Sequence, residues 1–208
     1  MLLLNLINSP LEFAIYIIVI LLALTVHEFA HAYVADKLGD DTPKLSGRLT
    51  LNPFAHIDLT GAIIFLIAGF GWGKPVEIRP EKLSYPRIDQ LTVALAGPVS
   101  NFILALAGGL ALKFLSIPEQ FSGIISIFVF FNLSLMVFNL IPIPPLDGSK
   151  VLRLFMSDVN YIILEQMGFY ILILFVIFSS TIPIIPFIMN KAVGFFFQLV
   201  TGHSIGIS

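Results

Sequence analysis

The chain has 208 residues and is too apolar for a soluble protein. Hydrophobic residues make up 57% of it and charged residues only 12%, and its mean hydropathy is +0.97. A soluble domain carries roughly 25% charged residues, so lipid must cover most of this surface. The formal net charge of -2 argues against a nucleic-acid partner. Because there is no cysteine, disulfides and thiolate metal ligands are excluded.

Three uncharged stretches are each long enough to cross a bilayer as a helix. They are residues 90–112, 120–146 and 166–190, with 23, 27 and 25 residues, and a spanning helix needs about 20. The earlier apolar stretch from residue 11 has no basic segment before it and no small-residue cleavage site, so we interpret it as a retained helix instead of a signal peptide. In chain order we predict helices at 11–35, 88–115, 121–141 and 161–181, then a break at Pro183 and Pro186 and a last apolar segment at 187–200.

The apolar segment 57–73 is predicted not to span. Only 15 uncharged residues lie between Asp58 and Lys74, and four of the residues in the segment are glycine. We expect a short re-entrant or hairpin segment here, between the first and second core helices, and then a short strand or hairpin at the membrane surface over residues 74–87. The fold class is therefore an all-α integral membrane protein, a polytopic bundle of about five to six transmembrane helices. We expect one domain over 1–208, with a core at 11–155 and C-terminal helices at 161–208.

Three ionisable residues lie together inside the first apolar helix, as His27-Glu28-Phe29-Ala30-His31. An ionisable side chain in the membrane costs a few kcal/mol and usually marks function. On a helix, residues four apart share one face, so both imidazoles can bind one metal ion. Glu28 sits beside them, placed to act on water at the metal instead of binding it. The alternative is a helix end reaching water, with these side chains satisfied by hydrogen bonds.

Two histidines leave a catalytic zinc site incomplete, because such a site usually has three protein ligands. The other histidines, His56 and His203, lie in a loop and in the tail. Asp147 ends the longest uncharged stretch, just after prolines at 142, 144 and 145 that break the helix and let the side chain turn inward. Asp147 is the best third ligand, although a lone aspartate there can also simply end a helix at the lipid boundary.

With these motifs in order, the chain resembles the site-2 proteases, zinc metalloproteases embedded in the membrane. The resemblance covers about residues 20–155 and rests on four motifs, namely His27 to His31, Asn52-Pro53 with His56 and Asp58, Ala96 to Asn101, and Asn139 to Gly148. It implies one zinc ion per chain held by His27, His31 and Asp147, with Glu28 as the catalytic acid/base. It also implies supporting roles near the substrate for Asn101, Asn139 and His56. The PDZ and CBS domains of some relatives are absent, which predicts a minimal form.

The distribution of basic residues supports the same site. If His31 and Asp147 share a metal, the first helix and the helix at 121–141 end on one membrane face, so the segment 57–73 must dip in and return. Nine basic residues then lie on that face, and only Lys113 is clearly opposite. The nine are Lys37, Lys44, Arg48, Lys74, Arg79, Lys82, Arg87, Lys150 and Arg153. By the positive-inside rule this face is cytoplasmic and the N-terminus lies outside.

The leading hypothesis is a multi-pass zinc endopeptidase in a bacterial or archaeal cell membrane. Its expected partners are the lipid bilayer and a membrane-protein substrate, which it cleaves in or near a transmembrane segment, as in regulated intramembrane proteolysis. The alternative is an ion-binding transporter or channel that uses the same four side chains as an ion path. Transporters commonly show repeated halves with paired broken helices, and we find no such repeat. The small-residue face around Gly97 and Gly108 favours close helix packing by itself.

Overall fold

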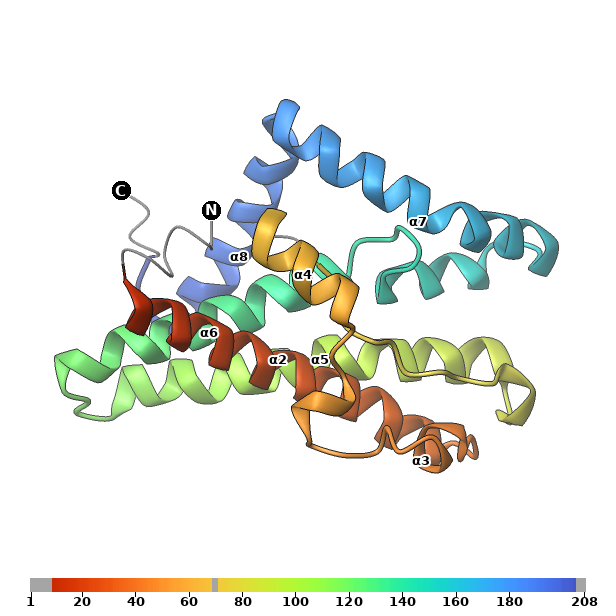
Figure 1. Ribbon diagram of the computed structural model, residues 1–208, viewed down its shortest axis with the longest axis horizontal. Helices are drawn as coiled ribbons and strands as arrows, with labels where there is room; N and C mark the ends of the chain where they lie inside the picture. Colours follow the sequence, from red (N-terminus) through yellow and green to blue (C-terminus); the bar gives the residue numbers. More distant parts are fainter. Residues whose placement is uncertain (1–8, 69–70, 205–208) are drawn as a thin grey trace.

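The structure, a computed structural model, describes residues 9–68 and 71–204, and these are helical apart from the connections (Figure 1). Five helices in these described ranges are long and apolar enough to cross a membrane. They are α2 (Pro10–Lys37), α5 (Pro86–Phe114), α6 (Glu119–Asn139), α7 (Asp158–Thr181) and α8 (Ile184–Thr201). The predicted all-α membrane bundle is thereby confirmed, and each helix begins and ends within a few residues of its predicted bounds.

Helices α2, α5 and α6 lie side by side and form the core of the bundle (Figure 1). Helix α8 packs against α5 and α6, and Val193, Phe197 and Val200 of α8 join Ala105, Val129 and Leu133 in one buried cluster. Glycines allow the close approach of the helices. A Cβ atom at Gly108 would lie 2.8 Å from Val129, and one at Gly109 would lie 2.7 Å from the Val200 carbonyl. This part of the small-residue face therefore serves helix packing, as predicted.

The segment 57–73 returns to the place where it began. Its helix α4 (Leu59–Ala68) has 10 residues, or about 15 Å at 1.5 Å per residue, half the thickness of the hydrocarbon layer. Ile57 and Gly73 form an antiparallel β-bridge, and the Lys74 amide donates to the His56 carbonyl at 2.8 Å. Because the two ends are paired, the segment is re-entrant, as the sequence predicted.

The predicted strand or hairpin at residues 74–87 is wrong. Within the described residues the only strand-like pairing is the isolated bridge at Gly73, and the rest of this connection contains the 3-10 helix η2 (Pro80–Lys82). Pro75 and Pro80 have no amide hydrogen to donate to a neighbouring strand. Other contacts fix the connection instead. The Arg79 amide donates to buried Asp40 at 2.6 Å, and Lys82 pairs with Asp41, which lowers the pKa of that carboxyl.

Short helices α3 (Thr42–Leu45) and η1 (Pro53–Ala55) and the 3-10 helix η3 (Asp147–Leu154) lie at the end of the bundle where α5 begins. Arg87, at the start of α5, pairs with Asp158 at the start of α7 at 3.0 Å, and Arg153 of η3 contacts the same aspartate at 3.4 Å. The connections after α2, before α5 and after α6 therefore share one end of the bundle.

Helix α8 ends at the opposite end of the bundle, beside the end of α5. The Val200 carbonyl lies against Gly109, and the Lys113 side chain lies next to Gly202. Since α7 begins at the end occupied by Arg87, α7 and α8 together return the chain across the membrane once. Figure 1 shows the same path, with α7 running obliquely over the bundle and α8 packed against it.

This arrangement predicts the membrane side of each connection. The chain has no cysteine, so single cysteines at the exposed positions Leu45, Glu81, Ser116 and His203 can be labelled with an impermeant thiol reagent in sealed vesicles of known orientation. We expect positions 45 and 81 to label from one side, and positions 116 and 203 from the other. Labelling of position 81 together with 116 would show that the segment 57–73 spans. Labelling of position 203 together with 45 would contradict the path of α7 and α8.

Candidate metal centre

His27 and His31 lie one turn apart on α2 and are 3% and 7% exposed. Their ring centroids are 4.6 Å apart, because residues four apart share one face of a helix. Each ring donates its Nδ1 hydrogen, His27 to Oδ1 of Asn101 at 2.6 Å and His31 to the Val93 carbonyl at 2.8 Å. With Nδ1 occupied as a donor, Nε2 of each ring carries the lone pair that a metal ion requires.

Asp147 is the first residue of η3, which follows the proline-rich break after α6, and its side chain approaches the two histidines. Its Oδ2 lies 3.1 Å from Nε2 of His27 and 3.4 Å from Nε2 of His31. This oxygen is buried and has no hydrogen-bond partner. Two imidazole nitrogens and one aspartate oxygen are a donor set that zinc uses in proteins.

The three ligand atoms fit a zinc ion. They lie within 4.8 Å of one another, and two imidazole lone pairs facing a carboxylate oxygen need a cation between them. Zinc bonds to nitrogen and oxygen of about 2.0–2.2 Å, arranged tetrahedrally, put neighbouring ligand atoms about 3.3–3.6 Å apart. The distances from Asp147 to the two imidazoles are close to this range. A catalytic zinc site usually keeps a fourth position for water or substrate.

Gly97 of α5 makes room for the two imidazoles. A Cβ atom at this position would lie 2.6 Å from both Cε1 and Nε2 of His27 and closer still to Nε2 of His31. Real Cβ contacts are essentially never shorter than 3.0 Å. The backbone of α5 therefore lies directly against the ligand atoms, which only glycine permits. The sequence suggested helix packing for this residue, and its place at the metal centre is visible only in the structure.

Asn101 lies behind His27 and does not line a cavity. It is fully buried, and its amide nitrogen donates to the Ala23 carbonyl at 3.1 Å and to Oδ1 of Asn132 at 2.9 Å. Its side-chain oxygen is then left to accept from His27. The contacts of Asn101 therefore connect it to a candidate metal ligand, and they leave its amide no free face for a substrate.

Asn139 and His56, the other two expected supporting residues, lie in different places. Asn139 ends α6 and lines the cavity described below, with its amide nitrogen bonded to the Leu135 carbonyl at 3.0 Å. The fully buried ring of His56 contacts the Thr50 carbonyl through Nε2 at 2.9 Å. His56 is not among the residues that line this cavity, and its backbone closes the base of the re-entrant segment.

The metal centre opens into one large cavity of about 990 Å³, which we name the central cavity. Glu28 lines it beside both histidines and Asp147. Apolar side chains from five different segments make up most of the wall, including Leu24, Phe65, Val93, Phe138 and Leu172. The volume and apolar lining are typical of a site for an organic ligand.

Helix α7 covers this cavity through a few contacts. The Phe169 ring meets Trp72 of the re-entrant segment edge to face, with centroids 5.7 Å apart. Glu165 accepts from Lys150 of η3 at 2.6 Å. Burial alone would lower the pKa of Lys150, but this hydrogen bond and the interactions with Tyr161 and the Glu165 charge together raise it. Gly168 packs against Pro144. Most of the rest of α7 lies exposed at the surface of the bundle.

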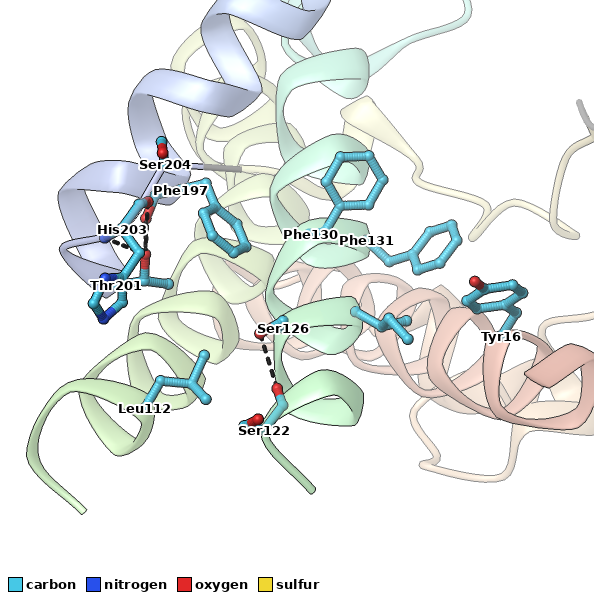
Figure 2. A pocket seen from close by; sticks show the side chains of 11 residues that line it. Tyr16, Leu112, Ser122, Ser126, Phe130, Phe131, Phe197, Thr201, His203 and Ser204 are labelled. Carbon is cyan, nitrogen blue, oxygen red and sulfur yellow. Dashed lines mark hydrogen bonds between the residues drawn. The ribbon is translucent and has the colours of Figure 1, made fainter. Parts of the chain in front are cut away.

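A second cavity, of about 790 Å³, lies at the other end of the bundle between Tyr16, Phe130, Phe197 and His203 (Figure 2). Three of the hydroxyl groups that line it, those of Ser122, Ser126 and Thr201, form hydrogen bonds within the chain. Ser126 donates to the Ser122 carbonyl at 2.8 Å, and Thr201 donates to the Phe197 carbonyl at 2.8 Å. None of the residues predicted to carry chemistry lines this cavity, so the central cavity is the candidate site.

Comparisons with known proteins agree with this geometry. Residues 15–122 and 113–182 match the model of peptidase family M50. YwhC of Bacillus subtilis, named as a candidate zinc metalloprotease, is 42% identical over 154 residues, which cover 69% of this chain and 70% of YwhC. Rip2 of Mycolicibacterium smegmatis, with a name of the same kind, is 34% identical over 182 residues, covering 81% of this chain and 70% of Rip2. Zinc metalloprotease MJ0392 of Methanocaldococcus jannaschii is 25% identical over 154 residues, 74% of this chain and 38% of that protein. No solved structure matches the chain.

Proposed function

Because the chain belongs to peptidase family M50 and is a zinc metalloprotease with several membrane helices, we propose that it cleaves transmembrane or membrane-proximal segments of other membrane proteins. His27, His31 and Asp147 hold the zinc ion, and Glu28 is the catalytic acid/base. The observation that carries this proposal is the shared position of these four side chains in one apolar cavity between membrane helices. A polar, soluble peptide would gain little binding free energy from an apolar wall, whereas the apolar side chains of a membrane segment would be buried favourably against it.

When bound, zinc supplies a Lewis acid that polarises the scissile carbonyl and makes water a stronger nucleophile. The chain's own residues do the remaining work. Asn101 and the Val93 carbonyl hold the two imidazoles in the tautomer that leaves Nε2 free. Glu28 takes a proton from the attacking water and delivers it to the amine that leaves. The apolar wall excludes bulk water, which strengthens every charge interaction inside the cavity.

A substrate helix must unwind before it can react. Its carbonyls accept hydrogen bonds from amides four residues later, so an intact helix presents no accessible scissile peptide. Glycine or proline near the cleavage position lowers the cost of unwinding. We therefore expect substrates with a helix-breaking residue near the membrane face where α2 ends. On the positive-inside rule this face is the cytoplasmic side of the cell membrane.

The test uses the purified protein in liposomes with two single-span substrates that differ only at one pair of positions, Gly-Pro in one and Ala-Leu in the other. We expect cleavage of the Gly-Pro substrate at least about tenfold faster, since the substitution removes more than 1.4 kcal/mol of helix stability. A zinc chelator should abolish both reactions, and added zinc should restore them. Equal rates for the two substrates, or cleavage that survives the chelator, would contradict the proposal.

A further inference from the structure

A chain of buried amides leads from His27 through α5 to α6. His27 donates to Asn101, and Asn101 donates to Asn132, a fully buried residue in the middle of α6. Asn132 in turn donates to the Phe128 carbonyl of its own helix at 2.9 Å. The sequence alone does not assign a role to Asn132, because the partner of a single amide in an apolar helix cannot be inferred from local pattern. In each hydrogen bond of this series, the donor and the acceptor can be assigned.

The directions follow from the two backbone carbonyls, which can only accept. The Phe128 carbonyl requires the amide nitrogen of Asn132, so the oxygen of Asn132 faces Asn101. The Ala23 carbonyl and the Asn132 oxygen both require the nitrogen of Asn101, so the oxygen of Asn101 faces His27. His27 must then carry its hydrogen on Nδ1, and its Nε2 is left with a lone pair toward Asp147.

We infer that Asn132 is a positioning residue of the metal centre, which fixes the amide of Asn101 and through it the tautomer and orientation of His27. If the Asn101 amide turned over, its oxygen would face two acceptors and its nitrogen would face His27 Nδ1. The favoured tautomer of His27 would then carry a hydrogen on Nε2 and could not bind metal. Asn132 supplies one of the two groups that prevent this, and the Ala23 carbonyl supplies the other.

This inference rests on the proposed function, because it assumes that His27 binds zinc. The effect of Asn132 is indirect, so we expect the low end of the range known for residues that orient a metal ligand, about a tenfold loss of zinc affinity in Asn132→Ala. Asn132→Asp should lose less zinc affinity than Asn132→Ala. A buried, neutral aspartic acid keeps an oxygen toward Asn101 and a hydroxyl toward the Phe128 carbonyl. Asn101→Ala, which removes the direct contact with His27, should lose at least as much as Asn132→Ala.

The measurement is the zinc dissociation constant of the detergent-purified full chain, obtained by competition with a chelator, beside the thermal unfolding of the metal-free protein. Two controls lie on the same helix. Leu133→Ala removes a fully buried apolar neighbour and should lower the unfolding temperature without weakening zinc. Ser126→Ala removes a hydroxyl bonded only within α6 and should change neither quantity.

The decisive result is the combination of Asn101→Ala with Asn132→Ala. If Asn132 acts through Asn101, the double variant binds zinc as tightly as Asn101→Ala alone. Additive losses, or wild-type affinity in Asn132→Ala, would overturn the inference while leaving the proposed function intact. A wild-type chain that binds no zinc would overturn both.

Discussion

Glu28→Gln is expected to lower the turnover of a membrane-spanning substrate by about 10²–10⁴-fold, the usual contribution of a general acid/base. Glutamine keeps the shape of the side chain but cannot take a proton from water. Glu28 lines the central cavity beside the metal centre and is not one of the three grouped ligands, so zinc and folding should be retained. Glu28→Asp should also be severely impaired, because the shorter side chain withdraws the carboxylate by more than the ~0.5 Å that a catalytic site tolerates.

A matched control lies on the same helix. Glu12 is an exposed glutamate in the first turn of α2, and Glu12→Gln makes the same chemical change far from the cavity, so its turnover should equal that of the wild type. Rates are measured with the liposome substrate at equal protein and zinc content. Wild-type turnover in Glu28→Gln would remove Glu28 from the catalytic role.

Gly97→Ala is expected to lose most of its zinc and to lower turnover by about 10²-fold or more, the cost of displacing a catalytic group by about 1 Å. The added methyl group would occupy the space of the two imidazoles. Neither ring can retreat freely, because Asn101 and the Val93 carbonyl hold them at Nδ1. The energetic penalty therefore falls on the metal geometry, or on α5 moving away from α2.

Glycine-to-alanine changes elsewhere in the helices separate this effect from helix propensity. A Cβ atom at Gly123 of α6 or at Gly194 of α8 would meet no atom within 4 Å, so Gly123→Ala and Gly194→Ala should keep full zinc and turnover, with equal or higher stability. Zinc per chain is measured by elemental analysis of the purified variants. Full zinc and wild-type turnover in Gly97→Ala would mean that the imidazoles have room that the structure does not contain.

The positions of the helices and of the His27–His31 pair could be predicted because they depend on local pattern. Uncharged stretches of more than 20 residues predict three of the five long helices, and two histidines four apart on a helix share a face in any fold. The re-entrant segment could also be predicted, from its length and glycines. Asp147 could also be predicted as the third ligand, because the prolines before it break the helix and let its carboxylate turn inward.

Features that depend on contacts between distant segments could not be predicted. Asn132 and Asn101 are 31 residues apart, and no local sequence pattern predicts that their side-chain amides form a hydrogen bond. Gly97 looks like any small residue until α2 is placed against it. Only the fold shows that the buried ring of His56 contacts the Thr50 carbonyl through Nε2, while its Nδ1 has no hydrogen-bond partner among the described residues. The prediction of a strand at 74–87 is wrong because apolar residues alternate there but no partner strand lies beside them in the part of the chain that the structure describes.

Membership in a protease family favours cleavage over the ion path that the sequence left as an alternative. The same four side chains would serve either function, so composition alone could not separate them. What distinguishes the two chemically is Glu28, because a base beside a metal ion is needed to split a peptide bond, whereas a carrier requires only charge.

The measurement closest to the central claim is the zinc content of purified wild-type protein and of four variants. We expect about one zinc per chain, the content of a mononuclear catalytic site, in the wild type and in Glu28→Gln. His27→Ala, His31→Ala and Asp147→Ala should each contain little, because each removes one of the three grouped ligand atoms. Undiminished zinc in Asp147→Ala, in a protein that remains folded, would contradict the metal centre described here.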